Sequence, residues 1–151
     1  MARIHERITN IRGDFQHKLS NGIIRDNQII ISEDLQISNM VKNHTRRASL
    51  VDQLAKAIAD VSWAEFTRQL EYKAEWNNRI YHKISPWFAS SQLCCVCGNK
   101  NKEVKCLSVR EWECKSCGAI HQRDENASKN ILKQGLLDLG LRKENYNLNI
   151  E

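Results

Sequence analysis

The sequence predicts an α-rich α/β fold with an inserted four-cysteine zinc ribbon. Apolar residues recur every three or four positions over long segments, and one proline and six glycines leave few breaks in them. Two short runs, residues 28–32 and 80–84, have the composition of strands. Two pairs of cysteines repeat the same spacing, which is typical of a zinc ribbon.

The first expected helix runs from Ile4 to about Asn21, and its apolar residues share one face. These residues are Ile4, Ile8, Ile11, Phe15 and Leu19. Gly22 is expected to end the helix, because glycine tolerates the left-handed backbone of a C-terminal cap. The strand at 28–32 follows and leads directly into Glu33 and Asp34, two acids at the end of a buried strand.

The segment from Leu35 to Val51 is the most basic part of the sequence and contains no acid. Its cations Lys42, Arg46 and Arg47 are candidates for contacts with nucleic-acid phosphates. The formal net charge of +5 permits a nucleic-acid partner. For any single lysine or arginine, the alternative is an ordinary solvated charge.

Two further helices are expected, one on either side of the cysteines. Ser62 and Glu65 have capping-box spacing, which predicts the start of a helix that ends near Trp76. Its buried face is expected to consist of Phe66, Leu70 and Ala74. The last helix is expected to begin with Asn126 as its cap and to carry Ile131, Leu132, Leu136 and Leu137.

The two cysteine pairs give the strongest chemical signal in the sequence. Each pair has two residues between its cysteines, and a glycine follows each pair at Gly98 and Gly118. The four cysteines are Cys94, Cys97, Cys114 and Cys117. Such a set predicts a closed, structural Zn²⁺ site that Trp112 shields, the alternatives being four buried thiols or two disulfides.

Considered alone, Glu33 and Asp124 are two acids near the ends of expected elements. Each could be an ordinary solvated acid or a helix cap. The order of motifs is more specific. The segments IISEDLQISNMVKN, SWAEFTRQLEYKAEW, WFASSQLCCVCGN, SVREWECKSCG and HQRDENASKNIL follow one another in the sequence. In this order they closely resemble the C-terminal half of TnpB, the OrfB-type transposase family of insertion sequences, which is related to type V CRISPR effectors. The resemblance extends from about His5 to Leu132.

This resemblance implies a RuvC-like nuclease of RNase H-type fold, in which a guide RNA directs the cleavage of DNA. In that family three carboxylates hold two Mg²⁺ ions, and a zinc ribbon precedes the last catalytic segment. Glu33 matches the family's catalytic glutamate, and Asp124 matches its final catalytic aspartate. Hard carboxylate oxygens suit Mg²⁺ and thiolates suit Zn²⁺, so the two kinds of metal site are not expected to compete.

The sequence departs from the family pattern at several places. The segment that holds the first catalytic aspartate has no counterpart here, and Gln122 and Gln92 stand where an acid and a lysine are usual. We therefore expect a transposase-family DNA-binding protein that is inactive alone and requires an N-terminal complementing chain. The alternative functions are a non-catalytic zinc-ribbon module that binds nucleic acid and a remnant without function.

The resemblance also predicts the domain limits. Residues 1–89 form a partial RuvC-like region, 90–121 the zinc ribbon, 122–140 the last RuvC-like segment and helix, and 141–151 a polar tail. The expected partners are DNA and a guide RNA, besides the complementing chain. No apolar run approaches a membrane span and no secretory signal is recognisable, which predicts a cytoplasmic protein.

Overall fold

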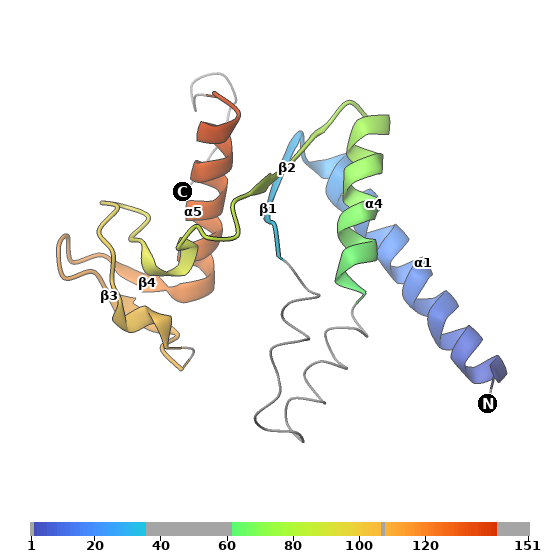
Figure 1. Cartoon of the computed structure of the whole chain (residues 1–151), viewed down its shortest axis with the longest axis horizontal. Helices are drawn as coiled ribbons and strands as arrows, with labels where there is room; N and C mark the ends of the chain where they lie inside the picture. The colour runs from blue at the N-terminus through green and yellow to red at the C-terminus, as the bar shows by residue number, and fades with distance from the viewer. Residues whose placement is uncertain (1, 36–61, 107, 142–151) are drawn as a thin grey trace. The chain divides into compact units, whose positions relative to one another are not determined.

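A computed structural model describes residues 2–35, 62–106 and 108–141 (Figure 1). It has a mixed α/β fold that divides into two compact units. One draws on Met1–Ile30 and Leu35–Tyr81, and the other on Ile31–Asp34 and His82–Glu151. No helix of the described residues is long and apolar enough to cross a membrane.

The first unit is built on two helices, α1 (Ala2–Asp26) and α4 (Trp63–Trp76), which lie side by side (Figure 1). Ile24, Leu70 and Ala74 are buried between them, and partly buried apolar side chains surround this core. The expected burial of Leu70 and Ala74 on the second helix is confirmed, with Phe66 packed at the edge of the core.

The helix α1 is longer than the sequence predicts. It passes through Gly22, which does not adopt a left-handed backbone, and ends at Asp26. The added turn places Ile24 in the core, where it is 2% exposed. Burial of an isoleucine is worth about 1.5–3 kcal/mol, which exceeds the roughly 1 kcal/mol that a glycine costs inside a helix.

The apolar face predicted for α1 exists, but the described residues do not bury it. Five large side chains on this face are 41–64% exposed, namely Ile4, Ile8, Ile11, Phe15 and Leu19. Toward α4 the face opens into an apolar groove of about 410 Å³ that Trp63 and Phe66 also line.

The predicted capping box at the start of α4 is wrong. Ser62 has a left-handed backbone (φ 50°, ψ 46°), and its side chain makes no capping hydrogen bond. Capping requires an extended backbone at this position. Glu65 instead accepts hydrogen bonds from Arg68 and Gln69.

The strands β1 (Ile29–Glu33) and β2 (Ile80–Ile84) form a two-stranded sheet. Their ends are joined by bonds from the Ile80 amide to the Gln28 carbonyl (3.0 Å) and from the Asp34 amide to the Ile84 carbonyl (3.2 Å). The two strands therefore run in the same direction. The sequence predicted both of them, the first with an offset of one residue.

The second unit holds the cysteines. Two single-turn 3₁₀ helices, η1 (Ser90–Gln92) and η2 (Glu103–Lys105), precede the antiparallel strands β3 (Glu111–Glu113) and β4 (Ile120–Gln122). The helix α5 (Arg123–Asp138) follows without a gap. Because α5 begins directly after β4, Gln122 is its N-terminal cap, and its side chain accepts a hydrogen bond from the Glu125 amide. The prediction that Asn126 caps this helix is therefore wrong.

Candidate metal centre and acidic pocket

The four predicted cysteines lie together. Their sulfur atoms are all within 4.8 Å of one another. The Sγ atoms of Cys94 and Cys117 are 3.7 Å apart, and those of Cys97 and Cys114 are 3.6 Å apart. Four thiolates about 2.3 Å from one tetrahedral ion would have sulfur–sulfur distances of roughly 3.8 Å. The spacing fits a metal ion the size of Zn²⁺.

The two alternatives for these cysteines do not describe the structure. None of the six cysteines forms a disulfide. Cys97 and Cys117 are exposed, whereas Cys94 and Cys114 are buried, so the set is not a buried thiol cluster.

Matching backbone turns hold the two cysteine pairs. The amide of Gly98 donates to the Cys94 carbonyl at 2.8 Å, and the amide of Gly118 donates to the Cys114 carbonyl at the same distance. Both glycines have positive φ, 76° and 72°, a backbone that L-residues with side chains rarely adopt. Backbone amides of Cys117 and Ser116 lower the pKa of the Cys114 thiol to about 6. A thiolate is the form that binds a metal.

His121 is part of the centre and was missed at the sequence level. Its Nε2 lies 3.0 Å from the sulfur of Cys94, and its ring lies against Trp112 with centroids 4.7 Å apart. The two rings face each other because Trp112 and His121 are paired across β3 and β4. Burial lowers the pKa of His121. The strand alternation that placed Trp112 beside the cysteines would have found His121, had the register of the hairpin been known.

Trp112 occupies the place that the sequence predicts. It is 7% exposed and packs with Val104, Cys94 and Cys114 in the core of the ribbon. It therefore shields the buried pair of sulfurs from water.

The predicted carboxylates Glu33 and Asp124 line one pocket of about 430 Å³. Glu33 ends β1 and is half-buried, and its Oε1 accepts a hydrogen bond of 2.6 Å from the Ser90 hydroxyl. Asp124 lies in the first turn of α5, is exposed, and has Arg110 at 3.4 Å. The structure thus brings together two side chains that are 91 positions apart in the sequence.

A basic side chain also lines this acidic pocket. Arg123 contributes to its wall. The Nε of Arg123 is buried and has no hydrogen-bond partner among the described residues. The guanidinium of Arg123 carries a permanent positive charge. The donor set of the pocket therefore combines hard carboxylate oxygens, which suit Mg²⁺, with a cation that suits a phosphate.

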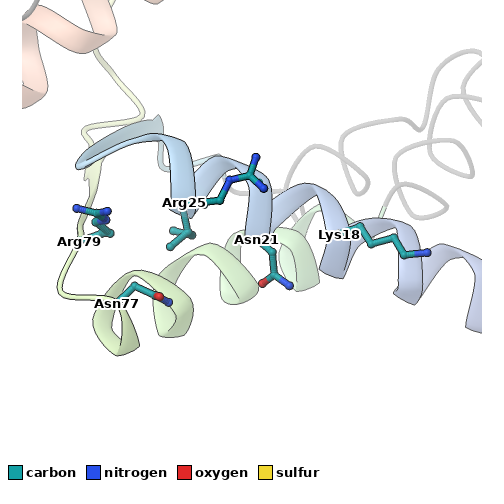
Figure 2. A pocket seen from close by; sticks show the side chains of 7 residues that line it. Lys18, Asn21, Arg25, Asn77 and Arg79 are labelled. Carbon is teal, nitrogen blue, oxygen red and sulfur yellow. The ribbon is translucent and has the colours of Figure 1, made fainter.

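The cations Lys42, Arg46 and Arg47 lie outside the described residues. A different basic pocket, of about 610 Å³, is lined by the first unit (Figure 2). Its polar lining residues are Lys18, Asn21, Arg25, Asn77 and Arg79. Arg25 and Lys18 also form exposed ion pairs with Asp26 and Asp14. The Nε of Arg79 is buried without a hydrogen-bond partner in the part of the chain that the structure describes. Sequence reasoning missed this pocket because its cations are dispersed along the chain.

Comparisons with known proteins agree with the motifs. The family model for the Cas12f1-like TNB domain matches residues 63–131. A putative RNA-guided DNA endonuclease of Streptomyces pristinaespiralis is 46% identical over 136 residues, covering 90% of this chain and 31% of the relative. The putative RNA-guided DNA endonuclease InsQ of Escherichia coli K12 is 34% identical over 142 residues, covering 89% of this chain and 35% of the relative. The chain thus spans about a third of the length of these relatives.

Two further matches extend this result. The TnpB-like protein L79 of Acanthamoeba polyphaga mimivirus is 28% identical over 136 residues, covering 90% of this chain and 25% of that protein. A chain of the Cas12f1–sgRNA–target DNA complex, solved by cryo-EM, has a TM-score of 0.61 at 18% identity, over 86% of this chain and 36% of that chain. The latter shows a shared fold.

Proposed function

Since the sequence resemblance to the C-terminal part of the TnpB family is confirmed, we propose that this chain is the portion of an RNA-guided DNA endonuclease that carries two of the three catalytic carboxylates and a structural zinc ribbon. The observation that supports it best is the shared pocket of Glu33 and Asp124. We further propose the domain limits stated above, with the ribbon at residues 90–121.

The pocket supports this function through its donor groups. Glu33 and Asp124 would hold divalent cations, and the Ser90 hydroxyl orients one oxygen of Glu33. The positive charge of Arg123, which lines the pocket, would attract a phosphate of the nucleic acid. Mg²⁺ held by these carboxylates would supply activation of a water and stabilisation of the leaving oxygen of a phosphodiester.

The four cysteines would hold Zn²⁺ in a purely structural role. The four sulfurs would take all four positions around a tetrahedral ion, which would leave none for a substrate or water. The sulfur–sulfur distances of 3.6 and 3.7 Å support this assignment.

The proposal predicts that the chain alone does not cleave DNA. Glu33 and Asp124 supply two negative charges where the family uses three carboxylates, so a second divalent cation would bind weakly or not at all. We expect no Mg²⁺-dependent cleavage with any guide RNA. Adding a polypeptide that carries the family's first catalytic aspartate segment is expected to give cleavage, and Asp124→Ala is expected to abolish it again. Cleavage by the purified chain alone that is lost in Glu33→Gln would contradict the proposal.

A second candidate is a non-catalytic module that binds nucleic acid. The basic pocket around Arg79 favours it, because no carboxylate is among the residues that line this pocket. On this reading DNA or RNA is held through its phosphates, with little dependence on base sequence. The two candidate functions make different predictions for a mixture with a complementing chain. The nuclease portion is expected to cleave DNA in that mixture, whereas the non-catalytic module is expected only to bind nucleic acid.

A further inference from the structure

Hydrogen bonds through buried side chains join the cysteine turn to the acidic pocket. Asn126, 2% exposed, accepts from the Cys95 amide at 2.9 Å and donates to the Leu93 carbonyl at 2.7 Å. These two backbone groups flank Cys94, so a side chain of α5 holds the cysteine turn directly.

One helical turn later, Asn130 continues the connection. It is 6% exposed, and its Nδ2 donates to the carbonyls of Leu93 (2.7 Å) and Ser90 (2.8 Å). Ser90 is itself 6% exposed, and its hydroxyl donates to Glu33 at 2.6 Å. The connection therefore ends on one of the two carboxylates.

The same helix carries the other carboxylate. Asp124 lies in the first turn of α5, two residues before Asn126. The position of α5 on the cysteine turn therefore sets where Asp124 lies, and the position of Ser90 sets where Glu33 points. Buried polar groups that are fully bonded fix one arrangement, because any other leaves some of them unsatisfied in a dry environment.

We propose that Ser90 is a positioning residue through which the loading of the cysteine site with metal orients Glu33 relative to Asp124. This inference rests on the proposed function, since it takes the cysteines as a metal site and Glu33 as a ligand for Mg²⁺. A metal ion fixes the turn of Cys94 to Cys97, and Asn126 and Asn130 transmit that position to α5 and to η1. Without the ion, the backbone groups that the two asparagines hold are free to move.

The test follows two side chains by NMR while Zn²⁺ is added to the metal-free full-length chain. The side-chain amide of Asn126 reports that the cysteine site fills, and the carboxyl carbon of Glu33 reports the acidic pocket. We expect both signals to shift with the same zinc dependence in the wild type. In Ser90→Ala the Asn126 shift remains and the Glu33 shift is lost. Ser90→Thr, which keeps the hydroxyl, is expected to restore it.

Ser128→Ala is the matched control. Ser128 also lines the acidic pocket, but its hydroxyl donates to the Glu125 carbonyl within the helix, so this variant is expected to behave as the wild type. A Glu33 signal that follows zinc equally in Ser90→Ala, or that ignores zinc in the wild type while Asn126 responds, overturns the inference.

Two results separate this inference from the proposed function. If Asn126 itself does not respond to Zn²⁺, the metal site at the cysteines is contradicted, and the inference with it.

Binding of Mn²⁺, a spectroscopic substitute for Mg²⁺, tests the acidic pocket by electron paramagnetic resonance. We expect zinc-loaded Ser90→Ala to bind Mn²⁺ about tenfold more weakly than the wild type and Ser90→Thr to bind it normally, in line with the loss of one charge-assisted hydrogen bond. Equal Mn²⁺ affinity in Ser90→Ala and the wild type contradicts the inference alone, whereas a wild type that binds no Mn²⁺ contradicts the assignment of the pocket.

Discussion

The Cys114 sulfur lies among backbone amides that stabilise its thiolate and lower its pKa to about 6. A metal ion can therefore bind it with little competition from protons. The proposed zinc site predicts one zinc per chain in the wild type and none in Cys114→Ser, measured by elemental analysis. Loss of structural zinc removes on the order of 10 kcal/mol from such sites, so the ribbon is expected to unfold locally.

Cys106→Ser is the control for this substitution. Cys106 is exposed and lies 3.0 Å from the Ser108 hydroxyl, outside the group of four sulfurs. This variant is expected to keep its zinc. A wild type that is purified without disulfides and contains no zinc would refute the assignment.

Glu65 makes the stability of the first unit depend on pH. Its hydrogen bonds with Arg68, and next with Gln69, lower the pKa of Glu65 to about 2 from its usual 4.5. Because the folded state binds the proton less tightly than the unfolded state, this contribution is complete above about pH 4.5 and is lost as the pH falls toward 2. We expect the difference in unfolding free energy between the wild type and Glu65→Gln to shrink over this range, measured by denaturant titration with NMR signals of Leu70 and Ala74. A difference that is independent of pH would contradict the assigned ion pair.

For single residues, sequence patterns predicted those whose role depends on local spacing. They missed those whose role depends on how strands pair or helices pack. The spacing of the cysteines and the glycines after them is local, and the structure brings all four sulfurs together. His121 joins them only through the register of β3 and β4. Asparagine is a residue type that often caps helices, but the side chain of Asn126 accepts a hydrogen bond from the cysteine turn instead. No local sequence pattern encodes this contact.

Among the elements, α5 approaches β1 closely at Gly135 and Ile31. A Cβ atom built on Gly135 would lie 2.4 Å from Cγ2 of Ile31, closer than side chains tolerate. We therefore predict that Gly135→Ala destabilises the second unit by about 1–3 kcal/mol, although alanine is the better helix former. The measurement is denaturant unfolding followed by amide signals of residues 126–136. The double variant Gly135→Ala with Ile31→Val, which removes one methyl group, is expected to recover part of the loss, and no recovery would speak against a steric cause.

Element types were predictable and their ends were not. The helices, both β-strands of the first sheet and the ribbon follow from periodicity and composition. The extension of α1 to Asp26 accompanies the burial of Ile24 against α4, and the left-handed backbone of Ser62 has no signal in the local sequence. The apolar face of α1 was predicted correctly from its helical spacing. Its burial was not, since no described residue covers it.

For the molecule as a whole, the resemblance carried more information than composition. A net charge of +5 permitted many partners, whereas the order of five motifs resembles one family, and the matches to RNA-guided DNA endonucleases, one of them 46% identical over 136 residues, agree with that resemblance. The convergence of Glu33 and Asp124 on one pocket could be expected from that family alone, because nothing in their local sequence links them.

The proposed binding of nucleic acid would depend on charges that are dispersed along the sequence. We expect the chain to bind single-stranded RNA or DNA with an affinity that falls as salt rises, because phosphate contacts release counterions. Arg79→Gln is expected to reduce the magnitude of the slope of log affinity against log salt by about 1, whereas Arg7→Gln, near the N-terminal end of α1 and outside the basic pocket, leaves the slope unchanged. Binding that is indifferent to salt, or equal slopes for the two variants, would contradict a phosphate contact at Arg79.

The ribbon occupies the long connection between β2 and α5, residues 85–122. The entropy lost on closing such a connection grows with its length, and a metal ion that gathers four cysteines reduces the length of flexible chain to be closed. With zinc bound by the four cysteines as proposed, the second unit therefore folds in a step whose rate rises with the concentration of free zinc. The first unit contains no cysteine and has no such requirement. In a zinc-poor cell the two units of a newly synthesised chain would fold at different times. The second unit would then be exposed to proteases in its unfolded state after the first unit had folded.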